Sequence, residues 1–168
     1  MSLHDDLLSQ AQHLLHREKR RPKQASLRRA VSAAYYALFH LLIAESSRML
    51  VSNPSLRSLV SRTFIHAEMN KTSRSFAGGN LPRKFDAVTE GKAVPNALRN
   101  VANVFSELQQ ARHLADYDLA KKFSRGEAQV FVDQASRAFQ DWQTIRKDDQ
   151  AQLYLACLLL WDRWDKIR

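Results

Sequence analysis

The segment Ala111–Asp118, with the sequence ARHLADYD, gathers side chains suited to phosphate chemistry. Arg112 and Asp116 are four residues apart, so in a helix they lie one turn apart on the same face. His113 and Tyr117 have the same spacing on the adjoining face. A guanidinium recognises phosphate through its bidentate geometry, and an imidazole transfers protons near neutral pH. The segment is therefore a candidate polar or catalytic site.

Arg112 interrupts a stripe of otherwise apolar residues that recurs at spacings of four and three. The stripe consists of Val94, Leu98, Val101, Phe105, Leu108, Arg112, Ala115 and Leu119. Such a stripe faces the core of a bundle, where an arginine must be paired or must face a cavity or a partner chain. Two interpretations stay open. Arg112 and Asp116 form a local ion pair at a helix end, or Asp116 holds Arg112 toward a phosphate.

Four further side chains are candidates to support this site. Arg29, Tyr36 and His40 fall on one face of a helix expected over about 24–50, and His66 lies in the polar segment TFIHAEMNK. Each type also has a structural interpretation, since a lone histidine on an apolar face is usually a hydrogen-bonded core residue. Buried tyrosines are likewise usually core aromatics with one bonded hydroxyl.

The charge balance favours a polyanionic partner. The 168 residues include 26 Lys and Arg against 17 Asp and Glu, a net charge of +9, which indicates nucleic acid first and a solvated basic surface otherwise. A long irregular stretch over about 72–94 is expected to be either functional or disordered. The nucleic-acid-binding candidates in and beside it are Lys71, Arg74, Arg83, Lys84 and Lys92.

Several chemistries lack their residues in this sequence. The single cysteine, Cys157, excludes an intrachain disulfide and a cysteine-rich metal site, and its apolar neighbours predict core packing. No Cys/His pairing with metal spacing, phosphate loop or G-x-S-x-G motif occurs, so neither a metal nor a cofactor is expected. No signal peptide or membrane-length apolar run is found, which predicts a cytoplasmic protein with no membrane partner.

Periodicity predicts an all-α chain, an up-and-down bundle of about five to six helices. It is expected to be one domain over 1–168, with a core over about 3–147 and an extra C-terminal helix over about 150–167. Ser124 and Glu127 predict a capping box at the start of one helix, and Pro95 suits the first turn of another. The remaining helices are expected over about 3–17, 24–50 and 55–71.

Three segments together resemble the HEPN superfamily of small helical domains: LRRAVSAAYYALFHLLIAE, RTFIHAEMNK and LQQARHLADYD. The resemblance covers roughly Ala11 to Gln143. It implies an α-helical bundle that usually dimerises. Many relatives are RNA-cutting toxins or defence nucleases, and some pair with a small nucleotidyltransferase. The family's nuclease motif is an arginine, an adjacent polar residue and a histidine a few positions later.

Arg112 and His113 match the first half of that motif, whereas Tyr117, Asp118 and Leu119 stand where its histidine belongs. A metal-free ribonuclease needs a group with a near-neutral pKa, which an arginine does not supply. Two hypotheses follow. The favoured one is a non-catalytic dimeric module that binds RNA, a nucleotide or a partner protein. The alternative is a metal-independent ribonuclease of a toxin–antitoxin or defence system, which uses Arg112 and a nearby histidine.

Overall fold

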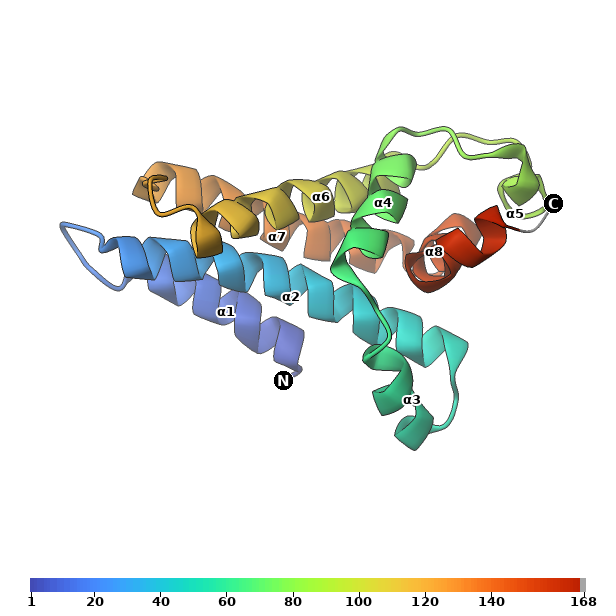
Figure 1. The fold of residues 1–168 in the computed structure, drawn as a ribbon, viewed down its shortest axis with the longest axis horizontal. Helices are drawn as coiled ribbons and strands as arrows, with labels where there is room; N and C mark the ends of the chain where they lie inside the picture. The colour runs from blue at the N-terminus through green and yellow to red at the C-terminus, as the bar shows by residue number, and fades with distance from the viewer. Residues whose placement is uncertain (167–168) are drawn as a thin grey trace. The chain divides into compact units, whose positions relative to one another are not determined.

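The structure, a computed structural model, describes residues 1–166, and every regular element in them is helical (Figure 1). The predicted all-α class is confirmed. The described residues form eight α-helices rather than five to six. Their bounds are α1 Leu3–His16, α2 Gln24–Leu50, α3 Pro54–Ser61, α4 His66–Ala77, α5 Asp86–Thr89, α6 Asn96–Tyr117, α7 Arg125–Ile145 and α8 Asp149–Asp165, with a 3-10 helix η1 at Arg83–Phe85 between α4 and α5.

The helix expected over 55–71 is in fact two helices, α3 and α4. The backbone N–H of Arg62 closes α3 on the carbonyl of Leu59 at 3.2 Å, and Ile65 is extended, with φ −113° and ψ 125°. Thr63, Phe64 and Ile65 are poor helix formers, and Phe64 is buried, so the break fits both propensity and packing.

The stretch expected to be irregular over 72–94 holds more regular structure than predicted. Helix α4 continues through Ala77, and η1 and α5 follow within the stretch. Glu90 ends α5 with φ 52°, a left-handed conformation that lets its N–H bond the Asp86 carbonyl at 2.8 Å.

The chain divides into two compact units whose boundaries fall inside α2, α6 and α7. The first unit comprises Met1–His40 and Val104–Gln140, and the second comprises Leu41–Asn103 and Asp141–Arg168. Each unit is described by itself below, and the prediction of a single domain stays a prediction.

In the first unit, α2 contributes small residues to the core. Ala30, Ala34 and Ala37 are fully buried, which allows close packing of neighbouring helices. Tyr35 is also fully buried, and its ring centroid lies 5.6 Å from that of Phe105.

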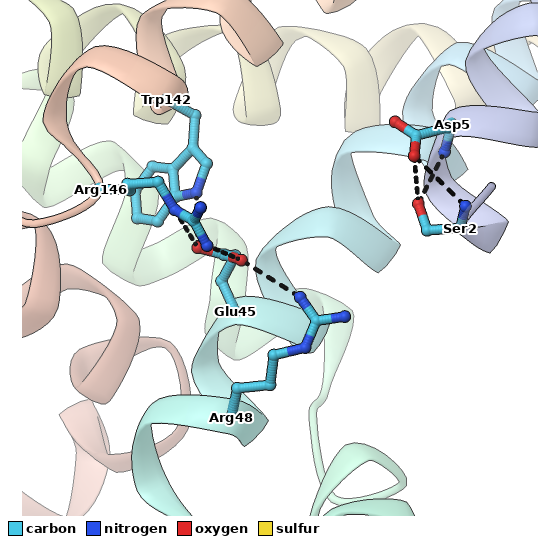
Figure 2. A network of polar contacts seen from close by, with 6 residues as sticks. All are labelled: Ser2, Asp5, Glu45, Arg48, Trp142 and Arg146. Atoms are coloured by element: carbon cyan, nitrogen blue, oxygen red, sulfur yellow. Dashed lines mark hydrogen bonds and ion pairs between the residues drawn. The ribbon is translucent and has the colours of Figure 1, made fainter.

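Two capping boxes begin helices of the first unit. Ser124 and Glu127 cap α7 as predicted, since Ser124 N donates to Glu127 at 2.8 Å and Glu127 N donates to Ser124 Oγ at 3.1 Å. Ser2 and Asp5 form the equivalent box at α1 (Figure 2). Both boxes satisfy backbone N–H groups that have no partner inside the helix.

In the second unit, α4 and α8 pack face to face through aromatic and hydroxyl contacts. The rings of Phe76 and Tyr154 are 4.9 Å apart, and the Tyr154 hydroxyl lies 2.8 Å from Ser73 Oγ. Cys157 is fully buried, which confirms its predicted place in the core, and burial raises the pKa of its thiol to about 12. The predicted C-terminal helix is present as α8.

The second unit also holds a nearly buried carboxylate, Glu45, between the end of α2 and α7 (Figure 2). It accepts Trp142 Nε1 at 3.1 Å and both Nε and Nη2 of Arg146, at 3.1 and 2.8 Å. Arg48 adds a longer contact of 3.4 Å. A bidentate guanidinium together with an indole N–H compensates for the burial of this charge.

Among the described residues, no helix combines the length and the apolarity that crossing a membrane requires.

Candidate functional site

Helix α6 turns Arg112 inward, as the apolar stripe predicted. Of the predicted stripe, the following are buried: Val94, Leu98, Val101, Phe105, Leu108 and Ala115. The side chain of Arg112 is only 12% exposed. Leu119 is the exception at 90% exposed, because α6 ends at Tyr117 and the stripe ends with it.

Three tyrosine rings surround the Arg112 guanidinium. Its Cζ lies 5.2 Å from the ring centroid of Tyr35, 5.8 Å from that of Tyr36 and 5.9 Å from that of Tyr117. A cation over aromatic faces is attracted by their quadrupoles, and more strongly where water is excluded. This cage is the physical reason why an arginine occupies a core-facing position.

The predicted ion pair between Arg112 and Asp116 is confirmed, with Nη1 and Oδ2 3.7 Å apart. Asp116 also accepts the Ser32 hydroxyl at 3.4 Å. Arg112 Nε is buried and has no hydrogen-bond partner among the described residues. The guanidinium is therefore enclosed by rings and by one carboxylate, and part of its donor capacity is unused.

The pKa of the Tyr35 hydroxyl is well above its ordinary value. Burial raises it, and the nearby positive charge of Arg112 offsets part of that rise. Tyr35 therefore stays protonated at physiological pH, and it faces Arg112 as a neutral group that also shares a hydrogen bond with the guanidinium.

His113 lies on the exposed side of α6, where its ring centroid is 5.1 Å from that of Tyr117. The predicted one-turn pairing of these two residues is confirmed. Tyr117 is 65% exposed even though its ring also lies beside Arg112. Together the two rings form an exposed aromatic pair at the end of α6.

The other predicted histidines lie in different surroundings. His40 is half-buried beside Tyr36, with ring centroids 6.3 Å apart, and burial lowers the pKa of its imidazole. It thus belongs to the aromatic cluster of the first unit. His66 is the first residue of α4 and belongs to the second unit.

Two hollows in the first unit border the exposed side chain of Arg29. One, of about 310 Å³ and called the α2–α6 cleft here, is lined by Ala25, Arg28, Arg29, Ala115, Asp116 and Tyr117. The other, of about 400 Å³, is lined by Leu7, Gln10, Leu14, Arg29, Ser32, Ala33 and Tyr36. The predicted supporting residues Arg29 and Tyr36 therefore do lie beside the Arg112 site.

Arg28 lies on the face of α2 next to that of Arg29 and belongs to this site, although the predicted set of supporting residues did not include it. Its Nη1 donates to the carbonyl of Ala115 at 2.8 Å, and its Nη2 donates to the carbonyl of Asp118 at 2.9 Å and to that of Lys121. These bonds satisfy one carbonyl in the last turn of α6, that of Ala115, and two carbonyls in the loop that follows the helix. Its position was the available signal. Arg28 directly precedes Arg29 on a helix whose other faces are apolar, so the same reasoning could have included it.

The five predicted nucleic-acid-binding cations all belong to the second unit, and three of them are paired. Lys71 bonds Asp162 at 2.6 Å, Lys84 bonds Asp165 at 2.8 Å, and Lys92 bonds Glu90. Arg74 and Arg83 are exposed. Local pairing reduces the positive charge that this region presents to a polyanion.

Metal-binding side chains do not cluster in the described part of the chain: nowhere do three or more His, Cys, Asp or Glu residues group as ligands. The expectation that neither a metal nor a cofactor is needed stays a prediction.

Searches for related proteins give no family assignment, since no family model, curated protein or solved structure matches this chain.

Proposed function

We propose that this chain is a HEPN-like helical module that binds RNA at the α2–α6 cleft without cutting it. One observation carries the proposal. Arg112 is enclosed by three tyrosine rings and Asp116, while Arg29 and Tyr117 border an open hollow on the same helices. The enclosed arginine lies beside the ring of Tyr117. The side chains of Arg29 and Tyr117 are exposed and are therefore available to a ligand.

The chemistry of the cleft supports RNA as the ligand. An exposed guanidinium such as that of Arg29 binds phosphate oxygens in a bidentate manner. An exposed ring such as that of Tyr117 stacks on an unpaired base. Single-stranded RNA offers a partner for each of these side chains, a phosphate for the guanidinium and an unpaired base for the ring.

The ionisable groups of the cleft support binding over cleavage. Cleavage at a 2′-hydroxyl needs a positioned group that exchanges a proton near neutral pH. The residues that line the cleft offer two arginines, one tyrosine and Asp116, and Asp116 is already engaged by Arg112 and Ser32. Arginine stabilises phosphate charge without taking up a proton.

A binding assay with single-stranded RNA tests this proposal. Fluorescence anisotropy of labelled oligouridylate compares the wild type with Arg29→Gln and Tyr117→Ala. Removing a phosphate contact or a stacking ring should weaken binding about tenfold in each variant. Arg137→Gln, which removes an exposed cation from α7 of the same unit, is the matched control and should bind within about twofold of the wild type.

The integrity of the RNA after incubation decides between binding and cleavage. We expect intact RNA on a denaturing gel in metal-free buffer. Cleavage that Arg112→Ala abolishes would establish the ribonuclease alternative instead. No binding by the wild type, or equal loss in the Arg137→Gln control, would overturn the proposed site.

A further inference from the structure

We infer that the two loops at the end of the first unit, residues 17–23 and 118–124, form a basic surface that holds the backbone of single-stranded RNA. This inference rests on the proposed function and extends the site from the α2–α6 cleft to the loops beside it. In Figure 1 the loop after α1 and the loop after α6 lie at the same end of the first unit.

Side-chain bonds to the backbone tie the two loops together. The Gln24 amide donates to the Phe123 carbonyl at 2.8 Å and accepts the Phe123 N–H at 2.9 Å. Arg125 donates to the carbonyl of Glu18, and the ring of Phe123 is buried. Because these bonds already fix the loops, a ligand pays little conformational entropy to bind them.

The loops carry more positive charge than their own acids offset, although Glu18 lies close to Arg17 and Lys23. Six of their cations are exposed and take part in no salt bridge within residues 1–166: Arg17, Lys19, Arg20, Arg21, Lys23 and Lys122. In the second unit, by contrast, Lys71, Lys84 and Lys92 each form a salt bridge with a carboxylate. A cluster of unpaired cations attracts the closely spaced phosphates of a nucleic acid backbone.

The acidic residues within the loops bond to neighbouring groups. Glu18 accepts the Ser26 hydroxyl at 2.9 Å, and Asp118 accepts the N–H of Ala120 at 2.9 Å. Their carboxylates shape the turns, while the cations point to solvent. The loops therefore combine a defined backbone with a surface that has an excess of positive charge.

Arg28 connects this surface to the α2–α6 cleft. It bonds the carbonyl of Asp118 at the start of one loop, and it lines the cleft together with Tyr117. The exposed Tyr117 and His113 rings lie beside that point, tilted against each other. A strand whose phosphates follow the loops would place an unpaired base on Tyr117, and this selects single strands over duplexes, whose bases are already stacked.

Two matched triple variants test the inference by salt-dependent RNA binding. One carries Arg20→Gln, Arg21→Gln and Lys23→Gln in the loop. The other carries Arg62→Gln, Lys147→Gln and Arg163→Gln on exposed sites of the second unit that are not among the predicted RNA-binding residues. We expect the loop triple to weaken oligouridylate binding about tenfold and to lower the slope of log Kd against log salt by about 2, since each single-strand phosphate contact contributes about 0.7. The control triple should change neither quantity.

The outcomes separate this inference from the proposed function. Binding that the loop triple leaves unchanged, or that both triples weaken equally, overturns the basic surface and leaves the cleft standing. No binding by the wild type overturns both. Equal affinity for duplex RNA overturns the preference for single strands. Displacement of the RNA by phosphatidylserine vesicles at equal phosphate concentration would assign the surface to a membrane instead.

Discussion

Arg112 places a permanent positive charge in a core position, and Asp116 and three tyrosine rings offset the cost of burying that charge. The spacing of α6 predicted its inward direction and its pairing with Asp116, because both follow from helical periodicity. The tyrosine cage was not predictable in the same way. Tyr35 and Tyr36 come from α2, far away in the sequence, and only the packing of α2 against α6 in the first unit brings them to the guanidinium.

A double-mutant cycle tests whether Arg112 and Asp116 act together. Arg112→Met removes the charge from the tyrosine cage and should lower the free energy of unfolding by about 1–2 kcal/mol. Asp116→Asn should cost less, because the carboxylate is partly exposed. The double variant should be less destabilised than the sum, with a coupling of about 0.5 kcal/mol or more in urea unfolding. Strict additivity would show that the pair has no energetic role.

At the scale of elements, sequence signals located the long helices and failed in the short connecting segments. Helices α6 and α7 begin close to Pro95 and Ser124. A proline is typical of the first turn of a helix, and a serine is typical of its N-cap. The break between α3 and α4 has no glycine or proline to mark it. It depends on the burial of Phe64, which is a tertiary effect. The same holds for η1 and α5, which are too short to show a periodicity.

The capping box of α7 makes a pH-dependent contribution to stability. Lys121 and the backbone of Ser124 lower the pKa of Glu127 from 4.5 to about 2. Because the folded-state pKa lies below the unfolded value, Glu127 stabilises the folded chain above about pH 4.5, and this stabilisation disappears as the pH falls toward 2.

Urea unfolding at a series of pH values checks this contribution. The stability difference between the wild type and Glu127→Gln should be largest near neutral pH and should shrink between pH 4.5 and 2. In a Lys121→Met background the difference near neutral pH should be smaller. A difference that is constant with pH would contradict the role of Glu127.

At the scale of the whole molecule, the net charge of +9 predicted a polyanionic partner but did not show where it binds. Lys71 and Lys84, beside and within the irregular stretch, are paired by acids of α8, which lie far along the sequence. The loops that carry unpaired charge are short and adjoin helix ends. Composition therefore indicates the class of partner, while the distribution of ion pairs indicates the surface.

The HEPN-like proposal also predicts a homodimer. Static light scattering should give a mass of twice 19.3 kDa at working concentration. A two-fold axis would present two copies of the α2–α6 cleft. A mass equal to a single chain across the concentration range used for RNA binding would contradict the dimer and leave the single-chain cleft to be tested alone.

The most direct test of the account is an NMR titration of the full chain with single-stranded oligouridylate, followed through the backbone amides. Because RNA is proposed to lie across the α2–α6 cleft and the adjoining loops, the largest shift changes should fall in residues 17–29 and 112–125. The RNA should be recovered intact at the end. Changes concentrated in residues 71–92, or RNA recovered as fragments, would contradict the central claim.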